Sequence, residues 1–378
     1  MPVSPPPDDS MLGVKVIKRE NRIGSGIARL LLAREASVVV VLIILFVLLF
    51  LSPQLATIGY LSQHIAGLAQ VRDNFYSQQN IQNMLLQIAL LSVYSIGETV
   101  VIITGGIDLS LGSLIGFSGM VLGMVAVHFF PQNGHPSMSS GEAILIAIAV
   151  ALAISIAVGA LQGTLVDKMK LPAFVVTLAS LVILRSQALV INQQLPITLS
   201  QFPSLLHLAD GHLFANTPFA IPIPFALLIV IAVIAHVILT KTTLGRYLYS
   251  VGSNEQASRL SGINVSRVKL FAYTSSALLG GIAGVLYAGY GAQGDPQAGV
   301  GYELNAVAAT VIGGASLFGG QGSIPGTILG AVLLQVLLNA INLTLSNPSI
   351  WQGSVVGGVL LMAVLVGAVQ QRKQGQGS

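Results

Sequence analysis

Long runs of apolar residues without a single charge dominate the chain from about residue 36 onward. A helix needs roughly 20 mostly apolar residues to cross about 30 Å of hydrocarbon. The clearest runs of this length are 143–166, 221–240 and 350–369. None of them alternates apolar and polar residues at every second position, as the strands of a membrane barrel would. The pattern therefore predicts membrane-spanning helices.

The same criterion applied along the whole chain predicts an all-α integral membrane protein with about ten helices, or eight if two segments only re-enter the membrane. The expected ranges are 36–55, 80–104, 109–130, 143–166, 172–192, 221–240, 269–289, 303–319, 324–343 and 350–370. Composition agrees, because 53% of the 378 residues are hydrophobic and only 8% are charged. The mean hydropathy of +0.82 exceeds what a soluble core requires.

The 17 basic residues are distributed very unevenly over the expected loops. Cytoplasmic loops of membrane proteins carry an excess of Lys and Arg. A threading of ten helices puts 15 basic residues on one side and leaves Arg72 on the other side and Arg185 inside a helix. Both termini are therefore expected in the cytoplasm. The net charge of +4 reflects topology and contact with anionic lipid, and no nucleic acid is expected as a partner.

Three parts follow from this threading. They are a basic cytoplasmic segment at 1–35, a transmembrane domain at 36–371 with a cytoplasmic loop at 241–268, and a cytoplasmic tail at 372–378. The first part lacks the pattern of a cleavable signal peptide and is expected to stay on the protein.

The stretch TGGIDLS at 104–110 separates two apolar runs and carries a carboxylate. Gly105 and Gly106 are expected to end one helix, since glycine is the favoured residue just beyond a helix end. Asp108 is placed to cap a helix that begins at Leu109. Alternatively, the segment is a broken helix that lines a polar path, as in many transporters.

A second stretch, IGGASLFGGQGSIPG at 312–326, echoes the first. Gly313 and Gly314 correspond to the earlier glycine pair, and GSIPG at 322–326 corresponds to GSLIG at 112–116. The echo predicts an internal duplication of a broken-helix unit. Helix counting makes the two copies parallel, although transporter repeats are often inverted.

Polar and glycine residues of these two units are the candidates for lining or gating a path. They are Glu98, Thr104, Gly105, Gly106, Asp108, Ser110, Ser113, Asn305, Thr310, Gly313, Gly314 and Asn339. For each polar member, an interhelical hydrogen bond is the alternative role.

The loop between the sixth and seventh expected helices is the longest basic one. Ser253 and Gln256 have the spacing of a capping box, and Gly262 supplies a stop signal. They predict a short amphipathic helix outside the lipid, which suits docking to a soluble partner.

The residues of this loop, GRYLYSVGSNEQASRLSGI at 245–263, resemble the coupling segment of permease subunits from ribose-type bacterial ATP-binding-cassette (ABC) importers. Three other stretches resemble the same family in the same order. They are TGGIDLSLGS at 104–113, LPAFVVTLASLVILRS at 171–186 and GYELNAVAATVIGGASLFGGQGSIPGTILGA at 301–331. The resemblance covers roughly residues 80–373.

The resemblance implies a subunit that translocates a sugar across the bacterial cytoplasmic (inner) membrane. A separate ABC ATPase subunit would hold ATP and Mg²⁺, an extracytoplasmic sugar-binding protein would deliver the solute, and a second permease, identical or paralogous, would complete the path. This chain would itself bind no cofactor. Residues expected to contact the ATPase are Asn254, Glu255, Ala257, Arg259 and Gly262.

Glu98 and Arg185 lie inside apolar runs, where a charge is costly unless it is paired or hydrated. Glu98 departs from the family, because a neutral residue such as Met is expected in many relatives. The two side chains could pair with each other. Otherwise Arg185 anchors backbone carbonyls or a carboxylate, and Glu98 lies in a water-filled path and binds sugar hydroxyls.

The sequence offers no chemistry of its own. It has no Gly-Lys dipeptide and hence no Walker A loop, no nucleophile elbow, no cysteine, and no histidines at metal-ligand spacing. We therefore expect no catalytic or metal site and no enzyme activity. Two other functions remain open, a proton-coupled carrier that uses Glu98 and Asp108, and an ABC permease for nucleosides.

Overall fold

The computed structural model describes residues 34–51, 71–131, 136–215, 217, 220–345 and 347–375. The expected segment 1–35 therefore lies almost entirely outside the described residues. The helices are α2 (Arg34–Phe50), α5 (Val71–Phe75), α6 (Gln78–Ile103), α7 (Leu111–Phe129), α8 (Ser140–Lys168), α9 (Ala173–Ile191), α10 (Pro203–Asp210), α11 (Ile223–Lys241), α12 (Thr243–Ser253), α13 (Glu255–Leu260), α14 (Val265–Tyr290), α15 (Tyr302–Ile312), α16 (Ile324–Thr344) and α17 (Pro348–Gly375). Four two-residue strands, β1 (Ile197–Thr198), β2 (His212–Leu213), β3 (Ile221–Pro222) and β4 (Gln293–Gly294), pair as β1–β4 and β2–β3.

Each of the ten expected apolar helices is present, and the predicted all-α membrane architecture is confirmed. Eight of the described helices are long and apolar enough to cross a membrane. The two others are α2, whose apolar part is Val38–Phe50, and α15. The tail expected at 372–378 is not separate from the last helix, since α17 continues to Gly375.

Helix α15 corrects one expectation. It was expected to run from 303 to 319, but it has 11 residues and ends at Ile312. Gly313 caps its end, and Gly314 has a φ of 93°, a conformation that glycine adopts without strain and other residues avoid. The helix was expected to continue to residue 319 because the composition of 313–319 is apolar.

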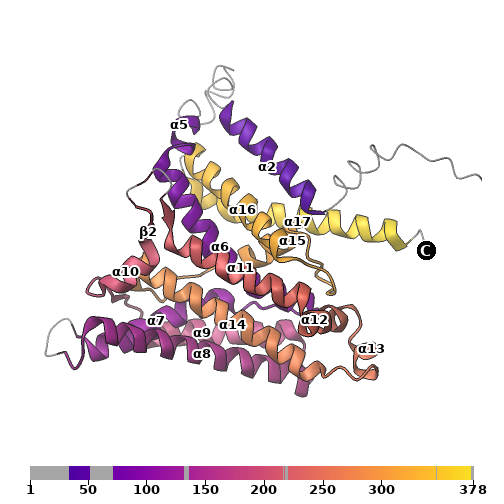
Figure 1. Ribbon diagram of the computed structural model, residues 1–378, viewed down its shortest axis with the longest axis horizontal. Coiled ribbons are helices and arrows are strands. Elements are labelled where there is room, and N and C mark those ends of the chain that lie inside the picture. The colour runs from indigo at the N-terminus through magenta and orange to yellow at the C-terminus, as the bar shows by residue number, and fades with distance from the viewer. Residues whose placement is uncertain are drawn as a thin grey trace, which may run out of the picture.

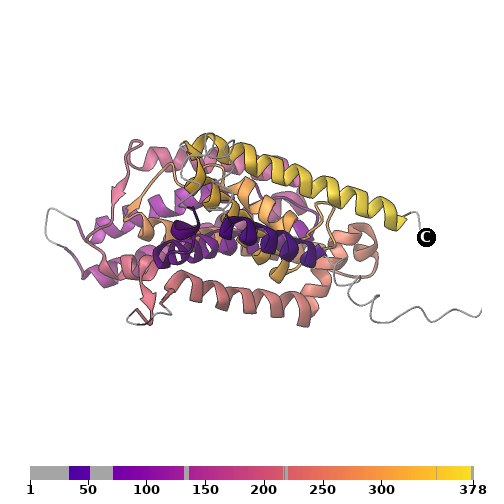
Figure 2. The same cartoon turned by 90° about the horizontal axis from the view of Figure 1, so that it is seen from above.

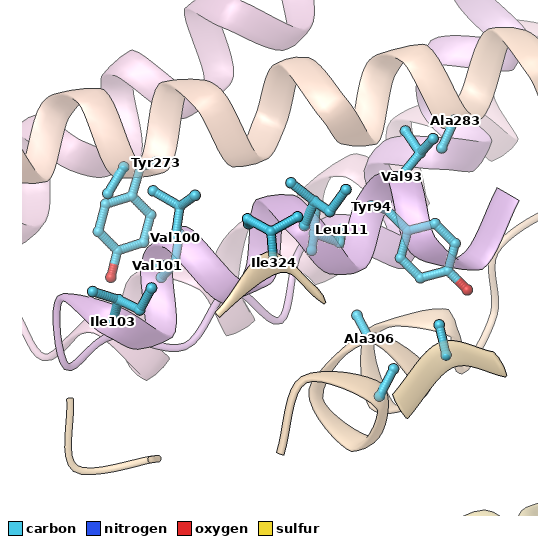
Figure 3. Close-up of a cluster of buried hydrophobic side chains, with 14 of the residues drawn as sticks. Val93, Tyr94, Val100, Val101, Ile103, Leu111, Tyr273, Ala283, Ala306 and Ile324 are labelled. Carbon is cyan, nitrogen blue, oxygen red and sulfur yellow. The ribbon is translucent and has the colours of Figure 1, made fainter. Parts of the chain in front are cut away.

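Helix α6 forms the centre of the bundle. Its most apolar 18-residue window is 94% buried, whereas those of α11 and α17 are only 17% and 6% buried. The peripheral helices expose apolar side chains, as expected of surfaces that face lipid. Figure 3 shows part of the core, in which Tyr94 and Val100 of α6 lie with Tyr273 of α14 and Ile324 of α16.

Close approach to α14 depends on glycine. A Cβ on Gly97 of α6 would lie 2.9 Å from the Cα of Ser276, and one on Gly159 of α8 would lie 2.8 Å from the Cα of Thr274. Small residues permit such backbone contacts between membrane helices. Helix α14 is therefore packed tightly between α6 and α8.

The two ends of the bundle differ in character. Helix α10 and strand β2 lie at one end, whereas α12 and α13 lie at the other (Figure 1). The carboxyl end of α17 lies at the same end as α13, as both views show (Figures 1 and 2). We call the α12–α13 end the basic end, because it includes Lys168, Lys241 and Arg259.

Candidate coupling and gating site

The first break, residues 104–110, folds back alongside the helix that it follows. Helix α6 ends at Ile103, and Gly105 has a φ of 81°, so the glycine pair ends the helix as expected. The backbone N–H of Asp108 then donates to both carboxylate oxygens of Glu98, at 3.2 and 3.3 Å. The non-helical segment thus returns into the bundle by more than one helical turn.

Asp108 caps a turn rather than the helix itself. Its Oδ1 accepts hydrogen bonds from the backbone N–H and the hydroxyl of Ser110, at 3.0 and 2.6 Å. Helix α7 begins at Leu111, two residues later than expected, and Ser110 is its N-cap. The expectation that Asp108 caps the helix is therefore wrong, because Ser110 occupies the N-cap position.

Two hydrogen bonds tie the break to two other helices. The Ser276 hydroxyl of α14 donates to Asp108 Oδ2 at 2.9 Å. Gln162 of α8 donates from Nε2 to the Ser110 hydroxyl at 2.8 Å. Asp108 and Glu98 are fully buried. Non-helical backbone at membrane depth is tolerated where it is buried in protein or lines water, and this segment is buried in protein.

Glu98 and Arg185 do not form an ion pair. The hypothesis that these two side chains pair with each other is therefore excluded. Arg185 donates from Nη1 to the carbonyls of Pro296 and Ala298, at 2.8 and 2.7 Å. The alternative expectation, that this arginine binds backbone carbonyls, is confirmed. It holds the segment 291–301 in place where it descends along α7.

The second break, residues 313–323, reaches the end of α6. The backbone N–H of Gly320 donates to the Ile103 carbonyl at 2.9 Å. Helices α6 and α15 run in the same direction, because Tyr302 stacks on Tyr94 at a centroid distance of 6.0 Å and Thr310 lies 3.2 Å from Thr99. The two units are thus parallel, as helix counting indicated, with both breaks at the basic end.

The remaining path candidates make contacts within the protein. Thr104 donates its hydroxyl to the Val101 carbonyl at 2.7 Å. Asn339 exchanges two amide hydrogen bonds with Asn80 of α6, at 2.9 and 3.1 Å. Ser113 is buried and Asn305 is half-buried. A role in lining a path stays a prediction for each of them.

The loop at 241–268, which is expected in the cytoplasm, contains two helices where one was expected. Ser253 is the last residue of α12, so the capping box proposed with Gln256 is wrong. Asn254 is the N-cap of α13 instead, and its side chain accepts from the Ala257 N–H at 2.9 Å. Gly262, with a φ of 83°, follows the end of α13 as expected.

Two of the expected contact residues hold α13 against the bundle. Arg259 pairs with Asp167 of α8 at 2.6 Å and with Glu255 at 2.9 Å. Glu255 also pairs with Lys269 of α14 at 2.6 Å. Asp167 was missed by the sequence analysis, because it lies 92 residues from its partner.

Electrostatics reinforce this network. Partial burial would raise the pKa of the Glu255 carboxyl, but hydrogen bonds and positive charge from Lys269 and Arg259 outweigh it and hold that pKa below its usual value. The hydrogen bonds from Arg259 to Glu255 and Asp167 raise the pKa of the guanidinium. Glu255 stabilises the network while it is ionised, so this contribution is lost only as the pH falls through the lowered pKa.

The outer side of α13 is left open. Gln256 and Ala257 are exposed, and Leu260 is 84% exposed. A large apolar side chain that is almost wholly exposed beside polar neighbours suits contact with another protein.

Helix α12, which the sequence analysis did not separate from α13, touches the second break and the last residue of α6, directly before the first break. The Tyr249 hydroxyl donates to the Gly322 carbonyl at 2.8 Å. A Cβ on Gly252 would overlap the Ile103 carbonyl and lie 2.6 Å from the Gly320 nitrogen. Gly252 was the one sequence signal for this contact. A glycine permits a close approach but does not indicate which backbone segment approaches it.

A helical bundle with eight possible membrane spans, two helix breaks and a short exterior helix held by ion pairs defines a multi-pass membrane transport protein. The chain belongs to the family described as the permease component of the branched-chain amino acid transport system, which matches residues 80–365. Members of this family are transport components of ABC importers rather than enzymes.

Known relatives agree with the family. The chain is 35% identical to the ribose import permease protein of Escherichia coli (strain K12), over 80% of this chain and 89% of the relative. It is 38% identical to the ribose import permease protein of Bacillus subtilis (strain 168), over 78% and 86%. It is 29% identical to the L-arabinose ABC transporter permease protein of Azospirillum brasilense, over 79% and 83%. No solved structure matches the chain significantly. The resemblance to ribose-type permeases is confirmed.

Proposed function

We propose that the chain is the membrane-spanning subunit of an ABC importer that translocates a pentose, a hexose or a related polyol across the bacterial inner membrane. The observation that carries the proposal is the position of α12 and α13. Helix α13 stands outside the membrane-spanning helices with its outer side exposed, and α12 connects it to the second break and to the end of α6. A subunit driven by a partner at this end needs such a connection.

The partner would be a separate ATPase subunit that holds ATP and Mg²⁺. This chain has no Gly-Lys dipeptide and thus no Walker A loop. The exposed Ala257 and Leu260 would enter a groove of the ATPase, while Glu255 and Arg259 transmit its movement to α8 and α14. A second permease copy, identical or paralogous, would complete the path, and an extracytoplasmic binding protein would supply the solute.

The proposed cycle follows from the contacts. Closure of the ATPase subunits would displace α13. This movement would pull α14 through the ion pair between Glu255 and Lys269. Helix α14 carries Ser276, which holds Asp108 in the first break. A shift of α14 would therefore move this break, and the bundle would alternate between outward-open and inward-open states.

A sugar is the favoured solute because the relatives named above are ribose and arabinose permeases. The buried network of Ser, Thr, Asn and carboxylate groups near the breaks supplies hydrogen-bonding groups of the kind that a polyol needs. A nucleoside, which carries a ribose ring, is the alternative solute.

Uptake of radiolabelled ribose into liposomes tests the proposal. The chain would be reconstituted with the ATPase and binding protein of its own transport system, and wild type compared with Glu255→Ala/Arg259→Ala. We expect the double variant to lose ribose-stimulated ATP hydrolysis and uptake together. Arg267→Ala, an exposed arginine at the same end that forms none of the described ion pairs, is the control and should behave as wild type.

Contradicting outcomes are clear. Uptake by the permease alone, driven by a proton gradient and abolished by Glu98→Gln, would replace the importer with a proton-coupled carrier. Uptake of adenosine without uptake of ribose would retain the importer and change the solute.

A further inference from the structure

The contact between Tyr249 and Gly322 joins segments that lie 73 residues apart. Tyr249 lies on α12, five residues before the N-cap of α13. Gly322 immediately precedes Ser323, the N-cap of α16. The hydroxyl therefore connects the base of the exterior helix directly to the start of a membrane-spanning helix.

Further contacts continue from this hydrogen bond to α6. Two residues before Gly322, the N–H of Gly320 donates to the carbonyl of Ile103, the last residue of α6. Gly252 of α12 packs against both of these groups, with no space for a Cβ. Three elements, α12, the 313–323 segment and the end of α6, thus meet at one place, which we call the clasp.

The clasp differs from the ion pairs of α13 in what it holds. Glu255 and Arg259 connect α13 to α8 and α14. The clasp connects α12 to the second break, and the described residues provide no ion pair there. Close backbone contact and a side-chain hydrogen bond from Tyr249 hold it together.

Resting on the proposed function, we propose that Tyr249 is a positioning residue that couples movement of α12 to the break between α15 and α16. Its ring is half-buried, and burial raises the pKa of the hydroxyl, so the group remains a donor at neutral pH. Displacement of α12 by the ATPase pulls Gly322, and with it the start of α16. The second break then opens together with the first, which α14 moves.

The test removes the hydroxyl and leaves the ring. Tyr249→Phe and wild type are reconstituted with the ATPase and binding protein, and ribose imported per ATP hydrolysed is measured. Losing one neutral hydrogen bond should lower this ratio about fivefold while ATP hydrolysis continues. Tyr247→Phe, on the same helix but 43% exposed, is the matched control and should leave the ratio unchanged.

A merely structural role would give a different result. If uptake and hydrolysis fall in parallel with the amount of folded protein, or if Tyr249→Phe matches Tyr247→Phe, the proposal is overturned.

A second measurement separates this proposal from the proposed function. Because the chain has no cysteine, spin labels can be placed at Arg246→Cys on α12 and Phe318→Cys in the second break, both exposed. The distance between the two spin labels is measured in the permease alone, in lipid nanodiscs. Its distribution should be narrow when Tyr249 is present and broad in Tyr249→Phe. Equal widths would exclude the clasp, even where ribose import is intact. Broadening would support it even if the wild-type complex imports no ribose, an outcome that would reject the proposed solute.

Discussion

At the scale of single residues, the buried carboxylates act first as organisers of backbone. Asp108 holds a non-helical turn by accepting from Ser110 and Ser276, and Glu98 accepts from the Asp108 N–H. Unpaired backbone donors inside a protein cost free energy, so these carboxylates make the break possible. The two side chains thus serve the architecture of the break.

Glu98→Gln should be tolerated, whereas Glu98→Ala should not. The amide oxygen of Gln can accept the Asp108 N–H, but Ala leaves this buried donor unpaired and creates a cavity. We expect Glu98→Ala to lower the free energy of unfolding by about 1–3 kcal/mol, measured by thermal denaturation of the purified permease in detergent. Equal melting temperatures for the Ala and Gln variants would contradict this role.

At the scale of elements, glycine decides where helices touch. Gly97 and Gly159 let α6 and α8 approach α14, and Gly252 lets α12 lie on the carbonyl of Ile103. The stripe Gly112–Gly116 on α7 has the same function, since Cβ atoms there would meet the carbonyls of Gly299 and Ala298. Gly112 and Gly116 thus form a packing surface.

Gly252→Ala should separate α12 from the second break and from the end of α6. A methyl group there overlaps the Ile103 carbonyl, and backbone must move to relieve the overlap. Overpacking of this kind typically costs about 1–3 kcal/mol, so we expect a lower melting temperature and a loss of coupled transport. Gly141→Ala is the control, because nothing lies within 4 Å of its Cβ position; a melting temperature as low as that of Gly252→Ala would show that the effect is not specific.

Sequence reasoning predicted the elements well and their contacts poorly. Apolar runs gave the ten helices, since length and hydrophobicity are local properties. The stop of α15 at Ile312 was missed because the residues that follow it are themselves apolar and small. Tyr249 and Asp167 were missed because each meets a partner that is far away in the chain, and one sequence carries no signal for such a pair.

At the scale of the whole molecule, the two ends of the bundle have different tasks. Both breaks, α12 and the ion pairs of α13 lie at the basic end. Near the far end of α6, by contrast, Asn80 and Asn339 join α6 to α16 by two amide hydrogen bonds. In the proposed cycle, the basic end would receive the movement of the ATPase. The opposite end carries the amide hydrogen bonds that hold α6 and α16 together.

Asn80→Ala should therefore weaken the fold without uncoupling it. Interhelical hydrogen bonds in membrane proteins average roughly 0.6 kcal/mol each, so we expect about 1 kcal/mol of lost stability in thermal denaturation. Ribose imported per ATP should remain at the wild-type value in the liposome assay. A fall in this ratio as large as that of Tyr249→Phe would mean that the two ends are not mechanically distinct.

The hydrogen bond from Ser276 to Asp108 spans 168 residues of sequence. At about 5–20 residues per second of synthesis, the ribosome produces Ser276 roughly ten to thirty seconds after Asp108. During that interval the nascent chain carries a carboxylate without its α14 partner and a glycine face on α7 without the segment that covers it. The first half of the bundle therefore spends this interval without the partners that complete its buried contacts.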